Sequence, residues 1–219
     1  MTTNTDIINF YNQIGFPGKY SVESIKNYQK TWNNIFIDFI DSKLYPGASV
    51  LDVGCGTGLI KNLLASKHTC NFTGIDFSDS IEYAKTMSLS LDNNVNWIRE
   101  NFVDYTTTDR YDIIICQGVL HHIIDYQKAI DNMIRLKKNK DSILLIGVYH
   151  PLGKFLQKFR KNFINDILRI DQKEHPFEKS WTKKEIQEMF SPLKLIDTNW
   201  SLINIANSSN GGLTIYVFK

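Results

Sequence analysis

Histidines follow two of the apolar runs in this sequence, at positions where their side chains could take up or release a proton. His121 and His122 come after the run 111–116, and His150 comes after the run 142–148. Histidine titrates in the range in which a general base can activate a hydroxyl or a carbon acid. His121 and His150 are therefore the candidate catalytic residues. A histidine that donates to a backbone carbonyl fits the same pattern and is the structural alternative.

Residues 49–58 read as a buried strand followed by a turn with three glycines at alternate positions. Glycine tolerates positive φ and lets the backbone approach a ligand closely, and the next helix directs its free N–H groups into the same space. A dinucleotide-binding turn would need its third glycine where Leu59 or Lys61 stands. A phosphate-binding P-loop would end in Gly-Lys-Ser/Thr, which is missing here. The turn therefore suits a different ligand that needs close backbone contact.

The elements that position these residues alternate between strand and helix, which predicts a parallel sheet with covering helices. Strands are expected at 49–53, 71–76, 95–99, 111–116 and 142–148, with two final strands near 193–203 and 213–218. Ligands of open α/β sheets lie outside the carboxyl ends of the strands, where the histidines and the glycine turn fall. Asp76 ends the second strand, where it can accept hydrogen bonds from ribose hydroxyls, and Ser78 is expected to cap the following helix.

The segment Asp52–Gly58 resembles the Asp/Glu-x-Gly-x-Gly-x-Gly loop of class I methyltransferases that depend on S-adenosylmethionine (SAM). The resemblance is specific over residues 46–150. It includes Leu120-His121-His122, which is common in small-molecule members such as the ubiquinone and menaquinone biosynthesis methyltransferases. It implies an α/β fold with a seven-stranded, Rossmann-like, mostly parallel sheet, an antiparallel last strand and helices on both faces.

The resemblance also implies which residues bind the ligands. The cofactor-binding residues would be Asp52, Gly54, Cys55, Gly56, Gly58, Asp76, Phe77, Asn101, Phe102 and Gln117. Asn101 stands where the family more often has aspartate, and Asp104 is the alternative residue for contacting the adenine. The acceptor pocket would include Tyr11, Tyr20, His122 and Tyr149, although the two N-terminal tyrosines would equally suit packing of a helix onto the core.

The chain is expected to form a single domain over 1–219. Residues 1–45 would make an N-terminal helical cap, with helices near 7–11 and 22–40, and residues 46–150 the SAM-binding core. Residues 151–176 would be a lid-like insertion with an apolar stripe, for which a partner helix or a membrane-surface helix is the alternative. A helix and the final strands, in 177–219, would complete the domain, with a capping box at Thr182 and Glu185.

Charge, cysteine spacing and the lack of targeting segments argue against several classes of protein. The net charge of +2 and the missing nucleobase-methylation motifs argue against a nucleic-acid partner. Neither a signal peptide nor a membrane-length apolar run appears, and the three cysteines lack metal-ligand spacing, so we expect a cytoplasmic protein without stable membrane association and without a metal. The predicted reaction is methyl transfer from SAM to an oxygen or nitrogen of a small molecule, with release of S-adenosylhomocysteine. The alternatives are an RNA methyltransferase and a SAM-binding protein without catalysis.

Overall fold

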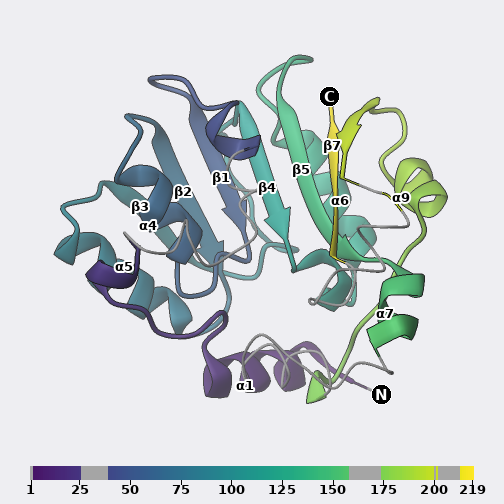
Figure 1. Cartoon of the computed structure of the whole chain (residues 1–219), viewed down its shortest axis with the longest axis horizontal. Helices are drawn as coiled ribbons and strands as arrows, with labels where there is room; N and C mark the ends of the chain where they lie inside the picture. The colour runs from purple at the N-terminus through teal and green to yellow at the C-terminus, as the bar shows by residue number, and fades with distance from the viewer. Residues whose placement is uncertain (1, 26–38, 158–173, 200, 202–212) are drawn as a thin grey trace.

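A computed structural model of the chain describes residues 2–25, 39–157, 174–199, 201 and 213–219. Its centre is a seven-stranded sheet with the strand order β3-β2-β1-β4-β5-β7-β6 (Figure 1). The strands are β1 (Ser49–Val53), β2 (Asn71–Asp76), β3 (Val95–Arg99), β4 (Ile113–Gln117), β5 (Ile143–Tyr149), β6 (Leu195–Thr198) and β7 (Leu213–Phe218). β7 runs antiparallel to its two neighbours, and the four other pairings are parallel. The predicted sheet is confirmed.

The central strands form because they are continuous apolar runs that can be buried on both faces. In β4, for example, the first four residues are all buried. The expected start of this strand at Tyr111 is wrong by two residues. Tyr111 donates its N–H to the carbonyl of Leu136 and forms an isolated bridge with Lys137, so it pairs with the segment after a helix before the chain enters the sheet.

Helices cover both faces of the sheet, as expected. They are α1 (Asn4–Ile14), α4 (Leu59–Ala65), α5 (Ser80–Ser90), α6 (Tyr126–Arg135), α7 (Pro151–Gln157) and α9 (Lys183–Met189), with a short 3-10 helix, η1 (Leu120–His122). α6 and α9 contribute Ile130, Met133 and Ile186 to one hydrophobic cluster. α4 contributes Leu63 and Leu64 to the cluster on the other face. Each face of the sheet therefore has its own core.

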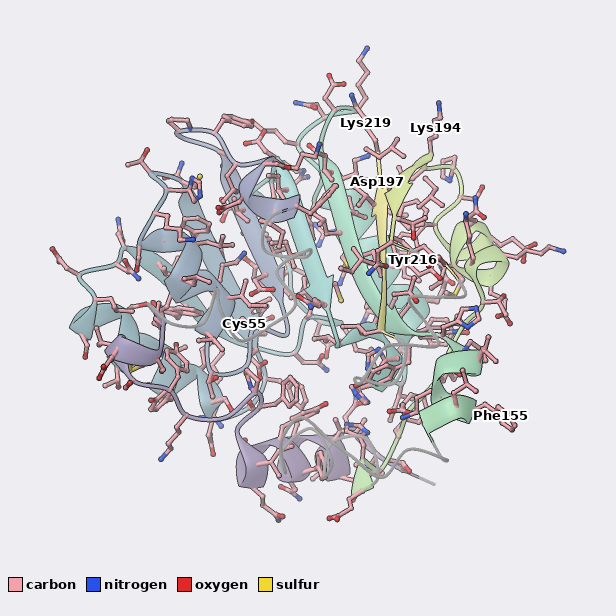
Figure 2. The ribbon with its side chains drawn as sticks, in the orientation of Figure 1. Cys55, Phe155, Lys194, Asp197, Tyr216 and Lys219 are labelled. Carbon is pink, nitrogen blue, oxygen red and sulfur yellow. The ribbon has the colours of Figure 1, made fainter. Side chains whose placement is uncertain are left out.

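The carboxyl ends of the parallel strands point toward α1, which lies across that edge of the sheet (Figure 1). α7 follows directly after β5 and lies near the same edge. Figure 2 places Cys55 between the end of β1 and α1, whereas Lys194 and Lys219 lie at the opposite edge. The space between the strand ends and α1 is therefore where the residues singled out from the sequence should meet.

One of the two predicted helix N-caps is present in the structure, and the one predicted near Asp76 is not. Thr182 and Glu185 form both hydrogen bonds of the predicted capping box. Ser78, however, is not the cap of α5, because the N-cap residue is Asp79 and it makes no side-chain cap bond. Ser78 turns back toward the end of β2 instead. The predicted helix 22–40 lies largely outside the described residues.

Candidate functional site

A cavity lies at the carboxyl edge of the sheet, between the strand ends and the N-terminal segment. Its polar lining residues are Asp52, Cys55, Asp76, Ser78, Ser80, Gln117, His122 and Tyr149. Its remaining lining residues are Ile7, Tyr11, Phe16, Pro17, Gly54, Gly56, Leu59, Ile60, Phe77, Gly118, Val119, Ile123 and Leu213. The lining therefore combines two carboxylates with an apolar and aromatic wall, and in the described part of the chain it includes neither lysine nor arginine. Such a lining favours a ligand that carries positive charge at one end and apolar groups at the other.

Asp76 is held rigidly at the end of β2. Its Oδ2 accepts from the N–H of Gly56 at 2.8 Å, and its Oδ1 accepts from both the N–H and the hydroxyl of Ser78, at 2.8 and 2.7 Å. Burial nevertheless raises the pKa of this carboxyl above its ordinary value, against the lowering effect of these bonds. The Ser78 hydroxyl was expected to cap a helix, but it fixes the acid that faces the cavity.

The backbone N–H groups of the glycine turn all donate hydrogen bonds to other groups of the protein. The N–H groups of Gly54 and Cys55 donate to the carbonyl of Ile75, and that of Gly58 donates to the carbonyl of Cys55. The N–H of Thr57 donates to the carbonyl of Phe16 at 3.0 Å. With the Gly56–Asp76 bond, all five N–H groups from residue 54 to residue 58 have partners within the protein.

The three glycines of the turn are required by close contacts with the protein itself. All three have positive φ, from 53° to 75°. A Cβ added to Gly54 would lie 2.5 Å from the methyl groups of Val119, and one added to Gly56 would collide with the Phe16 carbonyl. A Cβ added to Gly58 would meet Ala84 and Trp97. Gly58 lies against the core and does not line the cavity.

The N-terminal segment packs directly on the glycine turn. The Thr57 hydroxyl donates to the carbonyl of Gly18, and the Tyr20 hydroxyl donates to the carbonyl of Thr57 at 2.8 Å while accepting from the side-chain amide of Asn62. Tyr83 donates its hydroxyl to the carbonyl of Tyr20. Tyr20, which was expected in the acceptor pocket, is not among the residues that line this cavity, and its hydroxyl is bonded to the glycine turn.

Asp52, which lines the cavity, and Lys61 are both buried and influence each other's protonation. Burial raises the pKa of Asp52 to about 6, with Asp76 raising it further and Lys61 opposing the shift. Lys61 is fully buried in α4, and burial lowers its pKa. Its Nζ lies 5.5 Å from the centre of the Phe72 ring and, among the described residues, makes no hydrogen bond. Desolvation thus pushes both groups toward their neutral forms.

Neither proposed catalytic histidine lines the cavity. His121 is fully buried, with its ring 4.2 Å from the centre of the Tyr149 ring, and neither of its nitrogens has a hydrogen-bond partner in the described part of the chain. Burial holds its pKa well below the ordinary value. His150 accepts the N–H of Leu152 on Nδ1 at 3.2 Å, at the first turn of α7. Both side chains therefore lie outside the cavity lining, and a catalytic role for either stays a prediction.

His122, Tyr149 and Tyr11 do line the cavity, as the sequence suggested. Nδ1 of His122 lies 3.1 Å from the carbonyl oxygen of Phe177. Its ring packs against the ring of His175, with centroids 3.8 Å apart, and against the edge of Tyr11, at 6.1 Å. His175 was not identified from the sequence as a site residue, since it stands in the predicted insertion far from the strand ends.

The other residues expected to bind the cofactor are divided by the structure. Phe77 and Gln117 line the cavity, and Oε1 of Gln117 is buried with no hydrogen-bond partner among the described residues. Asn101 does not line it: its side chain accepts from the N–H of Val103 and donates to Asp104. Phe102 does not line it either, because it is part of the core between the sheet and α6.

Several lining residues carried no signal in the sequence. Ile7, Phe16, Pro17 and Leu213 look like ordinary core or turn residues until the chain is folded. Within the described ranges, no three His, Cys, Asp or Glu residues are grouped so that they could hold a metal ion. None of the helices described is long and apolar enough to cross a bilayer.

Comparisons with known proteins agree with this geometry. The family model described as "Methyltransferase domain" matches residues 44–192. A ubiquinone biosynthesis O-methyltransferase of Coxiella burnetii is 37% identical over 150 residues, which cover 66% of this chain and 58% of that protein. One of Rickettsia typhi is 33% identical over 120 residues, covering 51% of this chain and 48% of that protein. This chain thus spans about half the length of these curated relatives.

Solved structures share the fold. A magnesium protoporphyrin IX methyltransferase from Synechocystis PCC 6803 with bound SAH superimposes with a TM-score of 0.67. It is 15% identical, and the match covers 99% of this chain and 98% of that one. A TehB-like SAM-dependent methyltransferase from Corynebacterium glutamicum has a TM-score of 0.58 at 20% identity, covering 91% and 99% of the two chains. At these identities the likeness concerns the fold alone.

Proposed function

We propose, because this chain belongs to the methyltransferase domain family, that it transfers a methyl group from SAM to a small-molecule acceptor and releases S-adenosylhomocysteine. The acceptor atom would be an oxygen or a nitrogen, and the O-methyltransferase names of the relatives favour oxygen. The observation that carries the proposal is the fixed carboxylate of Asp76, which three donors hold at the tip of β2 and which faces the cavity.

The residues of the cavity fit SAM. Asp76 is placed to accept from the two ribose hydroxyls, with Phe77 beside it. Asp52 and the close backbone of Gly54, Cys55 and Gly56 would border the cationic part of the molecule. The buried Oε1 of Gln117 can accept a hydrogen bond that no described residue supplies. When bound, SAM would supply a methyl group made electrophilic by its sulfonium.

The apolar part of the cavity would hold the acceptor. Tyr11, Val119 and Ile123 line it together with Tyr149 and His122. The protein's contribution to methyl transfer is to hold the acceptor atom in line with the methyl group, which can lower a barrier by roughly 7–11 kcal/mol. A rigid wall of aromatic rings suits this task, because such side chains lose little conformational freedom when a ligand binds.

Other parts of the proposal rest on the sequence. We place the protein in the cytoplasm as a single domain over 1–219, without a nucleic-acid partner, in keeping with its net charge of +2 and its three free cysteines. Residues 151–176 would act as a lid for the acceptor. Of this segment, residues 158–173 lie outside the described residues; its first part, α7, follows β5, and Lys154 in α7 forms an ion pair of 2.7 Å with Glu178.

Asp76→Ala should weaken SAM binding by about 5- to 150-fold, equivalent to roughly 1–3 kcal/mol, because the ribose loses charge-assisted hydrogen bonds. Calorimetric titration of the purified protein with SAM and with S-adenosylhomocysteine measures this effect. Asp79→Ala is the matched control: Asp79 is three residues away, pairs with Arg99 and does not line the cavity, so SAM affinity should be unchanged.

The two possible failures can be told apart. A wild-type protein that binds neither SAM nor S-adenosylhomocysteine would overturn the proposed function. Wild-type binding together with full affinity in Asp76→Ala would overturn only the assignment of the ribose to Asp76.

A further inference from the structure

We infer that Glu178 makes the cavity selective for uncharged acceptors, because its carboxylate neutralises Lys154, the lysine that lies over the Tyr149 ring. This selectivity rests on the proposed function, since it concerns the molecule that receives the methyl group. An acceptor that carries a carboxylate or a phosphate would be methylated poorly. Glu178 does not line the cavity, so it is a positioning residue that acts on the acceptor through Lys154.

Lys154 brings a positive charge close to two rings of the cavity lining. Its Nζ lies 4.7 Å from the centre of the Tyr149 ring, and Tyr149 lines the cavity. A cation in this position is attracted by the face of the ring. His122 is the second ring, and its pKa is lowered by burial, then by His121 and His175, and also by Lys154. Without a counter-ion, Lys154 would therefore attract an anion bound against these rings.

Glu178 cancels this charge at short range. Its Oε1 lies 2.7 Å from Nζ of Lys154, and the side chains of Glu178 and Lys154 are only 18% and 19% exposed. A partly buried pair of this kind is screened little by salt. Burial raises the pKa of Glu178, and the hydrogen bond and charge of Lys154 oppose the rise, so the lysine keeps the carboxyl ionised. The pair presents no net charge to the rings in front of it.

Backbone hydrogen bonds hold the segment of Glu178 against the strand ends. The N–H of Lys179 donates to the carbonyl of His121 at 2.9 Å, and the N–H of Trp181 donates to the carbonyl of Tyr149 at 3.1 Å. Tyr149 is the last residue of β5, and α7, which carries Lys154, follows the same strand. Both members of the ion pair are therefore positioned by the end of β5, next to the ring that faces the cavity.

The other charges at the cavity also disfavour an anion. As far as the structure describes the chain, the lining carries the carboxyls of Asp52 and Asp76 and no lysine or arginine. SAM has two positive groups and one carboxylate, so bound SAM offsets only one of these acids. The charge of the buried Lys61 acts on Asp52. Lys179 lies 4.3 Å over the ring of Tyr126, which does not line the cavity. An uncharged acceptor fits this balance of charges.

The test compares hydroxybenzoates with the matching hydroxybenzamides, which have nearly the same shape and differ by one negative charge at neutral pH. In the wild type, kcat/KM should be higher for the amides by about tenfold or more. In Glu178→Gln, Lys154 loses its counter-ion, and this preference should shrink by about tenfold. The change should appear as a lower KM for the acids, while kcat for the amides stays nearly the same.

Two further variants separate the effect of charge from that of shape. Glu178→Gln combined with Lys154→Met removes both charges of the pair, so the preference for amides should return to the wild-type value. Asp141→Asn is the matched control, because it releases Lys219 from an ion pair of 2.8 Å at the opposite edge of the sheet (Figure 2). It should leave the preference unchanged. A preference that is lost in Glu178→Gln and does not return in the double variant would overturn the inferred role.

Calorimetric titration with SAM shows that each variant is folded and keeps the two levels of the proposal apart. A wild type that binds no SAM would overturn the proposed function. A wild type that binds SAM but uses the acids as well as the amides, or uses neither series, would overturn the role of Glu178 alone. An unchanged preference in Glu178→Gln would do the same.

Discussion

Gly58→Ala is expected to lower the free energy of unfolding by about 2–5 kcal/mol, more than Gly47→Ala, which should cost about 1–2 kcal/mol. Both glycines have positive φ, 75° for Gly58 and 81° for Gly47, so alanine is strained at either position. They differ in their surroundings. A Cβ at Gly47 would meet nothing within 4 Å, whereas one at Gly58 would lie 2.6 Å from both Ala84 Cβ and Trp97 Cη2.

Those neighbours of Gly58 cannot move away easily. Ala84 is fully buried in α5, and the indole of Trp97 is fixed by a 2.8 Å hydrogen bond from its Nε1 to the Ser88 hydroxyl. Urea unfolding of the wild type and the two variants measures the difference, provided that all three give similar m-values. Equal losses in the two variants would mean that backbone strain alone accounts for the effect and that the close contact contributes nothing.

Asp52→Asn should stabilise the ligand-free protein by about 2.5 kcal/mol at pH 7.5 relative to its effect at pH 4. Burial raises the pKa of Asp52 from 3.8 to about 6 in the folded protein. A carboxyl whose pKa is raised by folding contributes its full stability below the pKa of the unfolded state, where it is protonated in both the folded and the unfolded protein. This contribution is lost as the pH rises through the folded pKa of about 6. Asparagine stays neutral, so the variant's advantage should appear between pH 4 and 6 and then level off.

Chemical denaturation of wild type and Asp52→Asn across this pH range tests the prediction. Any effect of the substitution on packing is the same at every pH, so a change with pH in the difference between their free energies of unfolding reports the pKa of Asp52. The same substitution should weaken SAM binding at pH 7.5, since the cationic ligand loses the charge of a carboxylate that lines the cavity. A stability difference that does not change between pH 4 and 7.5 would contradict the raised pKa.

Most of the sheet could be predicted from the sequence, because a strand buried on both faces must be a continuous apolar run. The bounds expected for β1, β2 and β3 agree with the structure to the residue. The start of β4 was misplaced because Tyr111 extends the apolar run without joining the sheet. Asp76 was also predictable, since the end of a strand fixes where a side chain lies along the carboxyl edge.

The sequence did not predict which side chains of an element would face the cavity and which would enter the core. His121 and His122 are neighbours in one turn of 3-10 helix, and only folding decides that the first enters the core and the second lines the cavity. His175 packs against the ring of His122, although it stands more than fifty residues further along the chain, and both rings contact the backbone of Phe177. Ser78 was interpreted from its local sequence, but a nearby carboxylate competes for its hydroxyl.

The filled hydrogen bonds of the glycine turn have a consequence for competition inside a cell. ATP and NAD share the adenosine portion of SAM, and they are abundant. Their phosphates would need unoccupied backbone donors at the turn, but its five N–H groups are committed to Ile75, Asp76, Phe16 and Cys55. Two buried carboxylates in the same cavity would repel the phosphates further. We therefore expect ATP and NAD to bind this cavity more weakly than SAM.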